Sequence, residues 1–142
     1  MKLEFPFALA NLTIQLERKP GFGPYEGYHI SISGSGIITV EEFEERTFSN
    51  YSKTVSAHEI LKLLKYAIDI GFFEMPDGYK IREKLYLDGD EVAVEGFLCT
   101  DLPMLDLTIS TLTQTKSVRD YLGAPRRLKR LQSQIRNLAG FT

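Results

Sequence analysis

Cysteine, histidine and tryptophan are scarce in this sequence. Its 142 residues include one cysteine, two histidines and no tryptophan. A single cysteine cannot form a disulfide within the chain, nor can it supply the several thiolates of a structural zinc site. The hydrophobic fraction of 43% and the charged fraction of 25% are those of an ordinary globular protein. We therefore expect one domain over residues 1–142, with an ordered core over about residues 11–140.

Long apolar runs and a strong net charge are also absent. No segment approaches the roughly 20 consecutive apolar residues of a membrane-spanning helix. Glu4 and Pro6 interrupt the apolar start of the chain, which argues against a secretion signal there. The net charge of −2 is too small to draw the whole protein to nucleic acid or to an anionic membrane. Together with the unpaired Cys99, these features predict a cytoplasmic protein without membrane contact.

Alternating apolar and polar residues predict three strands in the first third of the chain. The first covers residues 11–18, and the second begins at Tyr28 and ends at residue 33. Gly34-Ser35-Gly36 then supplies the tight turn of a hairpin. The third strand continues from residue 37 to about residue 48. Three strands in this order predict an antiparallel meander.

Two helices follow from the spacing of apolar residues and from their end signals. Ser56 and Glu59 form a capping box at the start of the first helix, which Gly71 ends. Pro125 lies near the first turn of the last helix, where a missing backbone N–H costs little. The apolar side of the last helix is formed by Leu128, Leu131, Ile135 and Leu138.

The segment between the helices is harder to assign. Residues 79–87 fit a short helix or a strand, and a short strand is expected around residues 92–94, with Leu98 as a further member. Residues 104–113 and 116–121 predict two paired strands. The expected fold is therefore α+β, in the order β-β-β-α-(β)-β-β-α. It contains an antiparallel sheet of about five to six strands with two helices on one face.

Four blocks of this sequence resemble the signature of an uncharacterised bacterial domain family. The first, Pro20-Gly21-Phe22-Gly23-Pro24-Tyr25-Glu26-Gly27-Tyr28, matches in length the family's Pro-Cys-Phe-Gly-x-Cys-Pro-x-Tyr. Gly71-Phe72-Phe73 with Asp77-Gly78-Tyr79 resembles Gly-Phe-Phe and Asp-x-Tyr, and Thr100-Asp101-Leu102-Pro103 resembles Thr-Asp-x-Pro. The last, Val118-Arg119-Asp120-Tyr121-Leu122-Gly123-Ala124-Pro125, resembles Val-x-x-Tyr-x-Gly-Ala-Pro. The resemblance extends from about residue 11 to residue 140.

The resemblance implies the fold of that family but no activity, because its function is unknown and it has no agreed catalytic residues. The chain also departs from the family signature at the loop. Gly21 and Tyr25 stand where the two signature cysteines belong. A disulfide, metal or redox role for this loop is therefore absent from this chain.

No constellation in the sequence indicates a metal, a cofactor or a catalytic group. His29 and His58 have no carboxylate at ligand spacing, and both are expected at the surface. Asp88-Gly89-Asp90-Glu91 lacks the further ligands of a calcium loop. Cys99 has no recognisable general base, so we expect it to be a small buried side chain.

Positive charge is concentrated near the end of the chain. Residues 101–142 carry a net charge of +4, whereas residues 1–100 carry −6. The simplest interpretation is a solvated helix face, and the alternative is a docking surface for an acidic partner. Nucleic acid is not expected, because the aromatic residues of such surfaces are missing. The candidate basic surface consists of Arg126, Arg127, Lys129 and Arg130, with Arg136 on the same helix.

Aromatic and polar residues near the strand ends allow two functional interpretations. In the first, Phe22, Tyr25 and Tyr28 of the loop 19–27 form a recognition surface for another protein. In the second, Asp101, Arg119 and Tyr121 converge with Tyr25 or Tyr28 on a pocket for a small molecule or for catalysis.

A structural role for the same polar residues is favoured over a pocket, with Asp101 capping a turn and Arg119 pairing with it. The first interpretation, a small cytoplasmic interaction module rather than an enzyme, is therefore preferred. Self-association through a sheet edge or through the basic helix is compatible with it.

Overall fold

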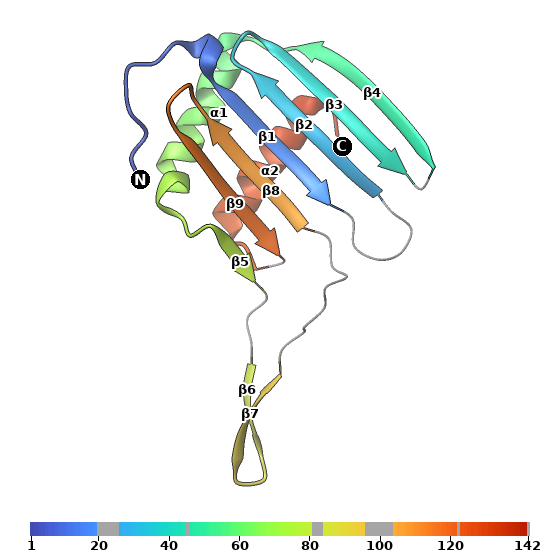
Figure 1. Ribbon diagram of the computed structural model, residues 1–142, viewed down its shortest axis with the longest axis vertical. Coiled ribbons are helices and arrows are strands. Elements are labelled where there is room, and N and C mark those ends of the chain that lie inside the picture. The colour runs from blue at the N-terminus through green and yellow to red at the C-terminus, as the bar shows by residue number, and fades with distance from the viewer. Residues whose placement is uncertain (20–25, 45, 81–83, 96–103, 122, 142) are drawn as a thin grey trace.

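The computed structural model describes residues 1–19, 26–44, 46–80, 84–95, 104–121 and 123–141, and these form an α+β fold (Figure 1). The strands are β1 (Thr13–Lys19), β2 (Glu26–Ser33), β3 (Ile37–Glu44), β4 (Thr47–Thr54), β5 (Gly78–Lys80), β6 (Lys84–Asp88), β7 (Glu91–Glu95), β8 (Met104–Ser110) and β9 (Thr115–Tyr121). The helices are α1 (Ala57–Asp69) and α2 (Arg126–Ala139), and the short 3₁₀ helices are Leu9–Asn11 and Phe72–Glu74.

Seven strands form the main sheet, in the order β4-β3-β2-β1-β8-β9-β5. Every neighbouring pair is antiparallel except β5 and β9, which are parallel. The sheet is thus larger than the five to six strands predicted from the sequence. β6 and β7 pair only with each other in a separate hairpin.

The predicted meander is present and has a fourth strand. Residues 37–48 were expected to form one strand, but the chain turns after Glu44 and returns as β4, beginning at Thr47. All eight side chains of β4 are exposed. Its sequence therefore has no need of the apolar alternation that identifies a half-buried strand.

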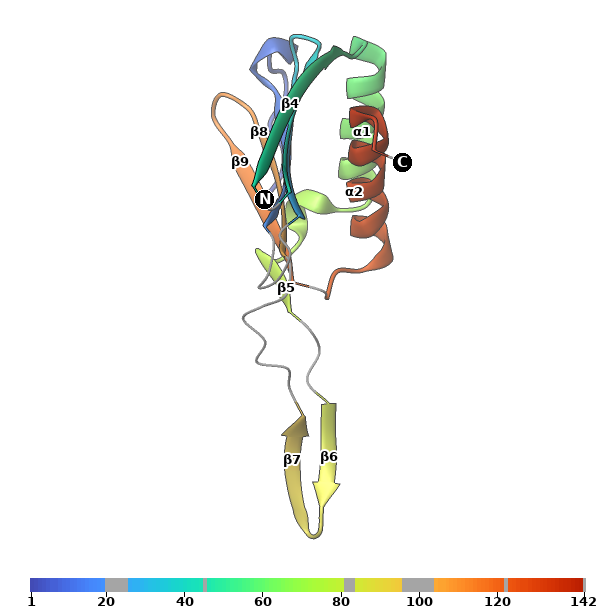
Figure 2. The same cartoon turned by 90° about the vertical axis from the view of Figure 1, so that its right-hand side faces the viewer.

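Both helices cover the same face of the main sheet, as predicted (Figure 2). Alternate residues of each strand face them. Ile14 of β1 lies between Ile32 of β2 and Ile109 of β8 in the strand register, and all three are buried. From the helices, the fully buried side chains include Ile60, Leu128, Leu131 and Ile135. The core is the layer between the sheet and the helix pair.

The predicted signals at the start of α1 are confirmed. Ser56 Oγ accepts a hydrogen bond from the Glu59 backbone N–H at 3.1 Å, and Glu59 Oε1 accepts one from the Ser56 N–H at 3.4 Å. Gly71 follows the helix with a φ of +76°, a conformation that favours glycine.

Buried or partly buried hydrogen bonds hold α2 near both of its ends. Asp120 of β9 accepts hydrogen bonds from the Ala124 N–H at 3.2 Å and from Gln132 Nε2 at 3.1 Å, and the Asp120 and Gln132 side chains are buried. At the other end, Tyr51 Oη of β4 donates to the Ala139 carbonyl at 2.8 Å. These contacts fix α2 against two separate strands of the sheet.

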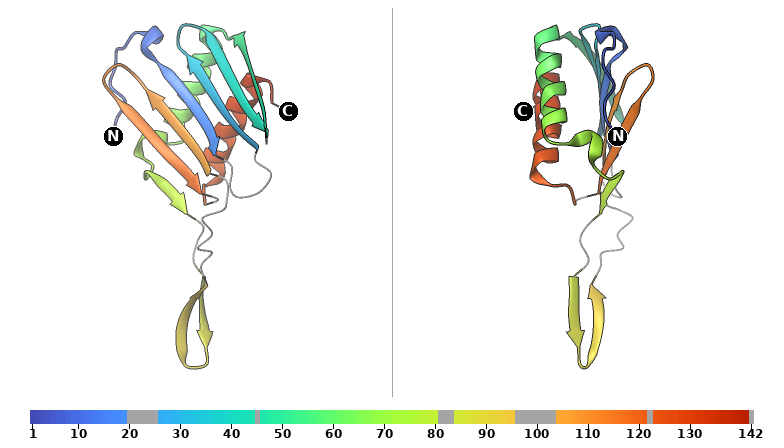
Figure 3. Two further views of the ribbon diagram at one scale, coloured as in Figure 1. Left: turned by 45° about the vertical axis from the view of Figure 1, so that its right-hand side comes forward. Right: turned by 90° about the vertical axis from the view of Figure 1, so that its left-hand side faces the viewer.

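The segment between the helices, whose secondary structure was hard to predict, contains one strand of the main sheet and a separate hairpin. The described part of residues 79–87 is in strands: Gly78–Lys80 joins the main sheet as β5, and Lys84–Asp88 forms β6. The strand expected around residues 92–94 is β7, and Leu98 lies outside the described residues. The β6–β7 hairpin projects away from the two-layer body (Figures 1 and 3). We call residues 84–95 the arm.

Replacing Ser56 with alanine should lower the free energy of unfolding by about 1 kcal/mol, because the start of α1 loses its cap. Urea denaturation followed by circular dichroism measures this difference. Ser52→Ala, at an exposed position of β4, is the matched control and should have little effect. Equal losses in the two variants would contradict the role of the capping box.

Candidate functional site

The sheet face opposite the helices carries a row of polar side chains. Strand register places Glu41 of β3, His29 of β2, Glu17 of β1, Asp106 of β8 and Arg119 of β9 side by side across five strands. These positions alternate with the buried ones, so their side chains face away from the core. We call these five residues the charged row.

The strongest contact in the charged row is a bidentate ion pair. Arg119 Nε donates to Asp106 Oδ1 at 2.8 Å, and a terminal nitrogen of the same guanidinium donates to Oδ2 at 3.1 Å. Lys19 Nζ lies 3.5 Å from Asp106 Oδ2. At the other end of the row, His29 Nδ1 lies 4.0 Å from Glu41 Oε2.

The surroundings of Asp106 keep it ionised. Partial burial raises the pKa of its carboxyl group, but the hydrogen bonds and charges of Arg119 and Lys19 outweigh burial and hold the pKa below its ordinary value. Hydrogen bonding to Asp106 in turn raises the pKa of Arg119. Nε and one terminal nitrogen of Arg119 are thus both engaged with Asp106, and the pair links β8 to β9.

Among the described residues, the partner of Arg119 is Asp106. Asp101, the partner expected from the sequence, lies outside the described residues. Tyr121 is half-buried and lies two residues after Arg119 on β9. A hollow of about 740 Å³ adjoins Arg119, lined by Met1, Asp77, Gly78, Asp106, Thr115, Lys116 and Ser117. Tyr121 does not line it.

The aromatic residues of the predicted recognition loop differ in their placement. Phe22 and Tyr25 lie outside the described residues. Tyr28 is buried, because it is on the same face of β2 as Ile30 and Ile32, and its ring centroid is 5.0 Å from that of Phe141. Burial raises the pKa of Tyr28, although the nearby Arg136 opposes the shift. Tyr28 therefore does not contribute to an exposed aromatic surface.

The candidate basic surface is exposed. Arg126, Arg127, Lys129 and Arg130 all lie at the surface of α2. Arg127 also donates a hydrogen bond from Nε to the Ile70 carbonyl at 3.1 Å, which ties the start of α2 to the end of α1. Over its whole length, α2 carries five basic residues and no acidic one.

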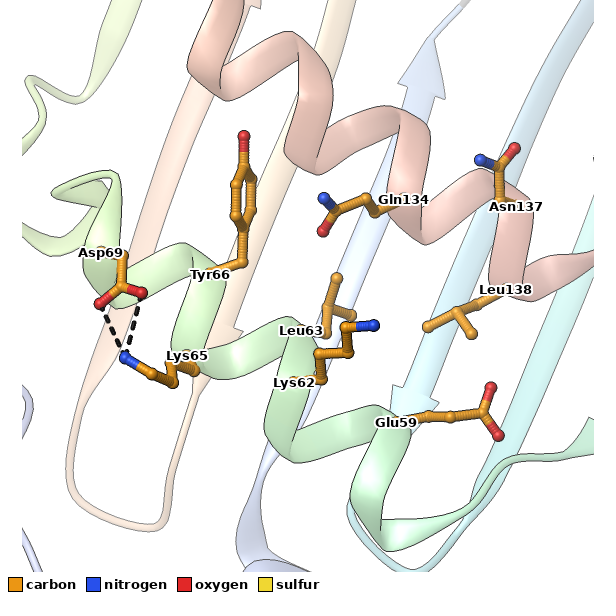
Figure 4. A pocket seen from close by; sticks show the side chains of 9 residues that line it. All are labelled: Glu59, Lys62, Leu63, Lys65, Tyr66, Asp69, Gln134, Asn137 and Leu138. Atoms are coloured by element: carbon orange, nitrogen blue, oxygen red, sulfur yellow. Dashed lines mark hydrogen bonds and ion pairs between the residues drawn. The ribbon is translucent and has the colours of Figure 1, made fainter.

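A groove of about 580 Å³ lies between α1 and α2 (Figure 4). Leu63 and Tyr66 of α1 and Leu138 of α2 form its apolar part. Lys65 and Asp69 form an ion pair at 3.1 Å on the α1 side. Sequence analysis did not identify this groove, because it joins helices that are far apart in the chain. Polar side chains that also line it are Glu59, Lys62, Gln134 and Asn137.

The arm exposes an aliphatic face. Leu85, Leu87 and Val92 are 72%, 74% and 69% exposed. Register pairs Leu87 with Val92, and Leu85 lies two residues before Leu87 on the same face of the hairpin. The sequence does contain a signal for this hairpin, since the two residues Gly89-Asp90 separate two alternating segments.

The described residues contain no group of three or more histidine, cysteine, aspartate or glutamate side chains that could hold a metal ion. No helix among them is long and apolar enough to cross a membrane. The structure is that of a small α+β domain with a polar sheet face, a basic helix and a projecting hairpin.

A comparison with protein families places this domain. The model of the family described as a domain of unknown function, DUF6438, matches residues 12–139. The match covers nearly the whole chain, and the chain belongs to this family. The likeness to an uncharacterised family that the sequence blocks indicated is thereby confirmed at the level of the family. No curated protein matches the chain.

Replacing Arg119 with glutamine should raise the pKa of Asp106 toward its ordinary value. With a depressed pKa, Asp106 contributes stability above the ordinary carboxyl range and loses it as the pH falls through the lowered pKa. The Arg119 side chain is about half exposed, so the loss of stability at neutral pH should stay below about 1 kcal/mol.

Carbon-13 NMR titration of the Asp106 carboxyl group measures this shift directly. Lys129→Gln, which removes an exposed cation from α2, is the control and should leave the titration unchanged. The same titration curve in wild type and Arg119→Gln would show that Arg119 does not set the charge state of Asp106.

Proposed function

We propose that this domain is an interaction module and that the arm is its protein-binding element. One observation carries the proposal: three aliphatic side chains gather on one face of a projecting two-stranded hairpin, each at least 69% exposed. A hairpin of two strands is only marginally stable in water by itself. An exposed aliphatic face on such an element becomes favourable when another surface covers it.

The distribution of apolar residues over the rest of the molecule supports this proposal. On the main sheet the large aliphatic residues of β1, β2 and β8, such as Ile14, Ile32 and Ile109, are buried beneath the helices. Leu112 is 80% exposed, but it stands alone in the turn before β9, and single exposed apolar residues are common. Phe43 and Phe48 at the β3–β4 edge form a second exposed apolar group, with ring centroids 5.2 Å apart, but at 45% and 54% they are less exposed than the three contiguous aliphatic residues of the arm.

The energy available from the arm is appropriate for binding. Complete burial of a leucine or valine side chain contributes about 1.5–3 kcal/mol. Because about 70% of each side chain is still exposed, Leu85, Leu87 and Val92 together offer roughly 3–6 kcal/mol, from which the loss of translational and rotational freedom must be subtracted. A contact of this kind needs additional surface or charge complementarity to become tight.

Small-molecule binding or catalysis beside Arg119 is less well supported. The hollow there has sufficient volume, but the Arg119 guanidinium is engaged with Asp106. Phe22 and Tyr25 of the predicted binding loop lie outside the described residues, so the proposal depends on the arm. We also propose a cytoplasmic location, which agrees with a chain whose only cysteine is Cys99.

Replacing Leu87 with a photo-crosslinking amino acid in the full chain should yield covalent protein adducts when cells that express it are illuminated. The adducts are expected because a partner that covers the aliphatic face brings its own side chains next to residue 87. Mass spectrometry identifies the adducts.

The same crosslinker at Leu112 is the matched control, because this leucine is at least as exposed and lies in the turn between β8 and β9, outside the arm. Adducts from position 87 but not from position 112 support the proposal. Equal yields at both positions, or none at position 87, would contradict it.

A further inference from the structure

The arm is acidic as well as aliphatic. It contains one basic residue, Lys84, and four acidic residues, for a net charge of −3. Three of the four, Asp88, Asp90 and Glu91, surround the turn at its tip, and all three are exposed. A surface that covers the aliphatic face of the arm must therefore lie close to three carboxylates, and a positively charged surface fits this requirement best.

The same chain carries one such surface, on α2. The net charge of −2 divides into +5 on α2 and −7 on all other residues. Arg126, Lys129 and Arg130 are exposed there. Charges on two surfaces interact over about 8–10 Å in physiological salt. The acidic tip therefore does not need to pair ion by ion with α2 in order to be attracted to it.

An apolar groove runs beside this basic surface. Leu138 of α2 lines it together with Leu63 and Tyr66 of α1 (Figure 4). In α2, Arg130, Gln134 and Leu138 are spaced by four residues and so share one side of the helix. An aliphatic segment in this groove would thus have Arg130 on its α2 side. The charged side chains that line the groove itself belong to α1 and balance one another: Glu59, Lys62, Lys65 and Asp69.

The arm is short enough to lie along α2. A strand of five residues, such as β6, extends about 17 Å. A helix of 14 residues, such as α2, extends about 21 Å. The arm can therefore lie along α2 over most of its length, with its aliphatic face toward Leu63, Tyr66 and Leu138.

In a single copy, the arm and the groove remain apart. The arm projects from the end of the body, away from α1 and α2 (Figures 2 and 3), whereas the groove lies between these two helices. The high exposure of Leu85, Leu87 and Val92 shows that the arm is uncovered in this arrangement. Every copy has both an arm and a groove. In a dimer with a two-fold axis, the arm of each copy can therefore occupy the groove of the other.

We propose that the arm binds a second copy of this chain: its aliphatic face occupies the α1–α2 groove of that copy, and its acidic tip lies against the basic side of α2. Two copies exchange arms in a symmetric dimer. This inference depends on the proposed function of the arm and names its partner.

The purified full chain should sediment as a dimer, with twice the monomer mass of 16.1 kDa. Leu87→Lys should weaken this dimer at least tenfold, because a charged side chain then enters an apolar groove. Leu112→Lys places the same residue at an equally exposed site outside the arm and should leave the dimer intact. Circular dichroism of each variant confirms that the fold is retained.

A charge exchange between copies tests the docking surface itself. One variant, Asp88→Lys with Glu91→Lys, makes the tip basic and keeps a like-charge pair at this register position. The other, Arg126→Glu with Lys129→Glu and Arg130→Glu, reverses three cations of α2 and changes the net charge of this helix from +5 to −1. Each variant alone should be largely monomeric, because the arm and the helix then repel each other at both contacts.

Mixing the two charge variants should restore dimers, because both contacts of the mixed dimer join opposite charges. One contact joins the basic tip of the first variant to the acidic helix of the second. The other joins the unchanged tip of the second variant to the unchanged helix of the first. Sedimentation of the mixture, with the two variants labelled differently, measures this recovery.

Three results would overturn the inference. A wild-type chain that stays monomeric up to about 1 mM would exclude even a weak dimer. A dimer that is unaffected by Leu87→Lys would place the interface elsewhere, and a mixture that stays monomeric would exclude docking on α2. The crosslinking experiment at Leu87 then separates the two proposals, because adducts with another protein would retain the arm as a binding element with a different partner.

Discussion

The whole structure depends on one constraint: two helices cover a seven-stranded sheet on one face only. Alternate residues of the inner strands must then be apolar toward the helices and polar toward water. Ile14, Ile32 and Ile109 satisfy the first requirement, and Glu17 and Asp106 satisfy the second. Polar groups gather on the open face for this reason, and solvation and ion pairing account for the charged row.

In the proposed dimer, the helix layer has a second role, which depends on how firmly α2 is fixed. Asp120 and Gln132 hold one part of it through buried hydrogen bonds, and Tyr51 holds its last turn. The inner side of α2 therefore packs into the core, and the cations of this helix lie on its outer and lateral sides. A basic surface on a fixed helix is a well-defined target for an acidic partner, because little order has to be gained on binding.

The sequence allows elements to be predicted where one local signal determines the structure. Both helices could be predicted from apolar spacing and end signals, and most strands of the main sheet from alternation. β4 could not be separated from β3, because an edge strand with exposed side chains needs no apolar pattern. The sequence suggested that Arg119 forms an ion pair, but the register of β8 and β9 determines its partner. The groove could not be predicted from the sequence, because only tertiary packing brings Tyr66 and Leu138 together.

The arm is the part of the molecule whose composition folding does not explain. Leu107 belongs to the core, so its aliphatic side chain is accounted for by the stability of the domain. Leu85 and Leu87 contribute nothing to that core, since both are more than 70% exposed, and polar residues at these positions would serve solubility better. Because the arm and the core consist of different residues, the proposed docking predicts that changes in the arm alter association while the body stays folded. That proposal gives the aliphatic residues of this hairpin a physical reason outside the single chain.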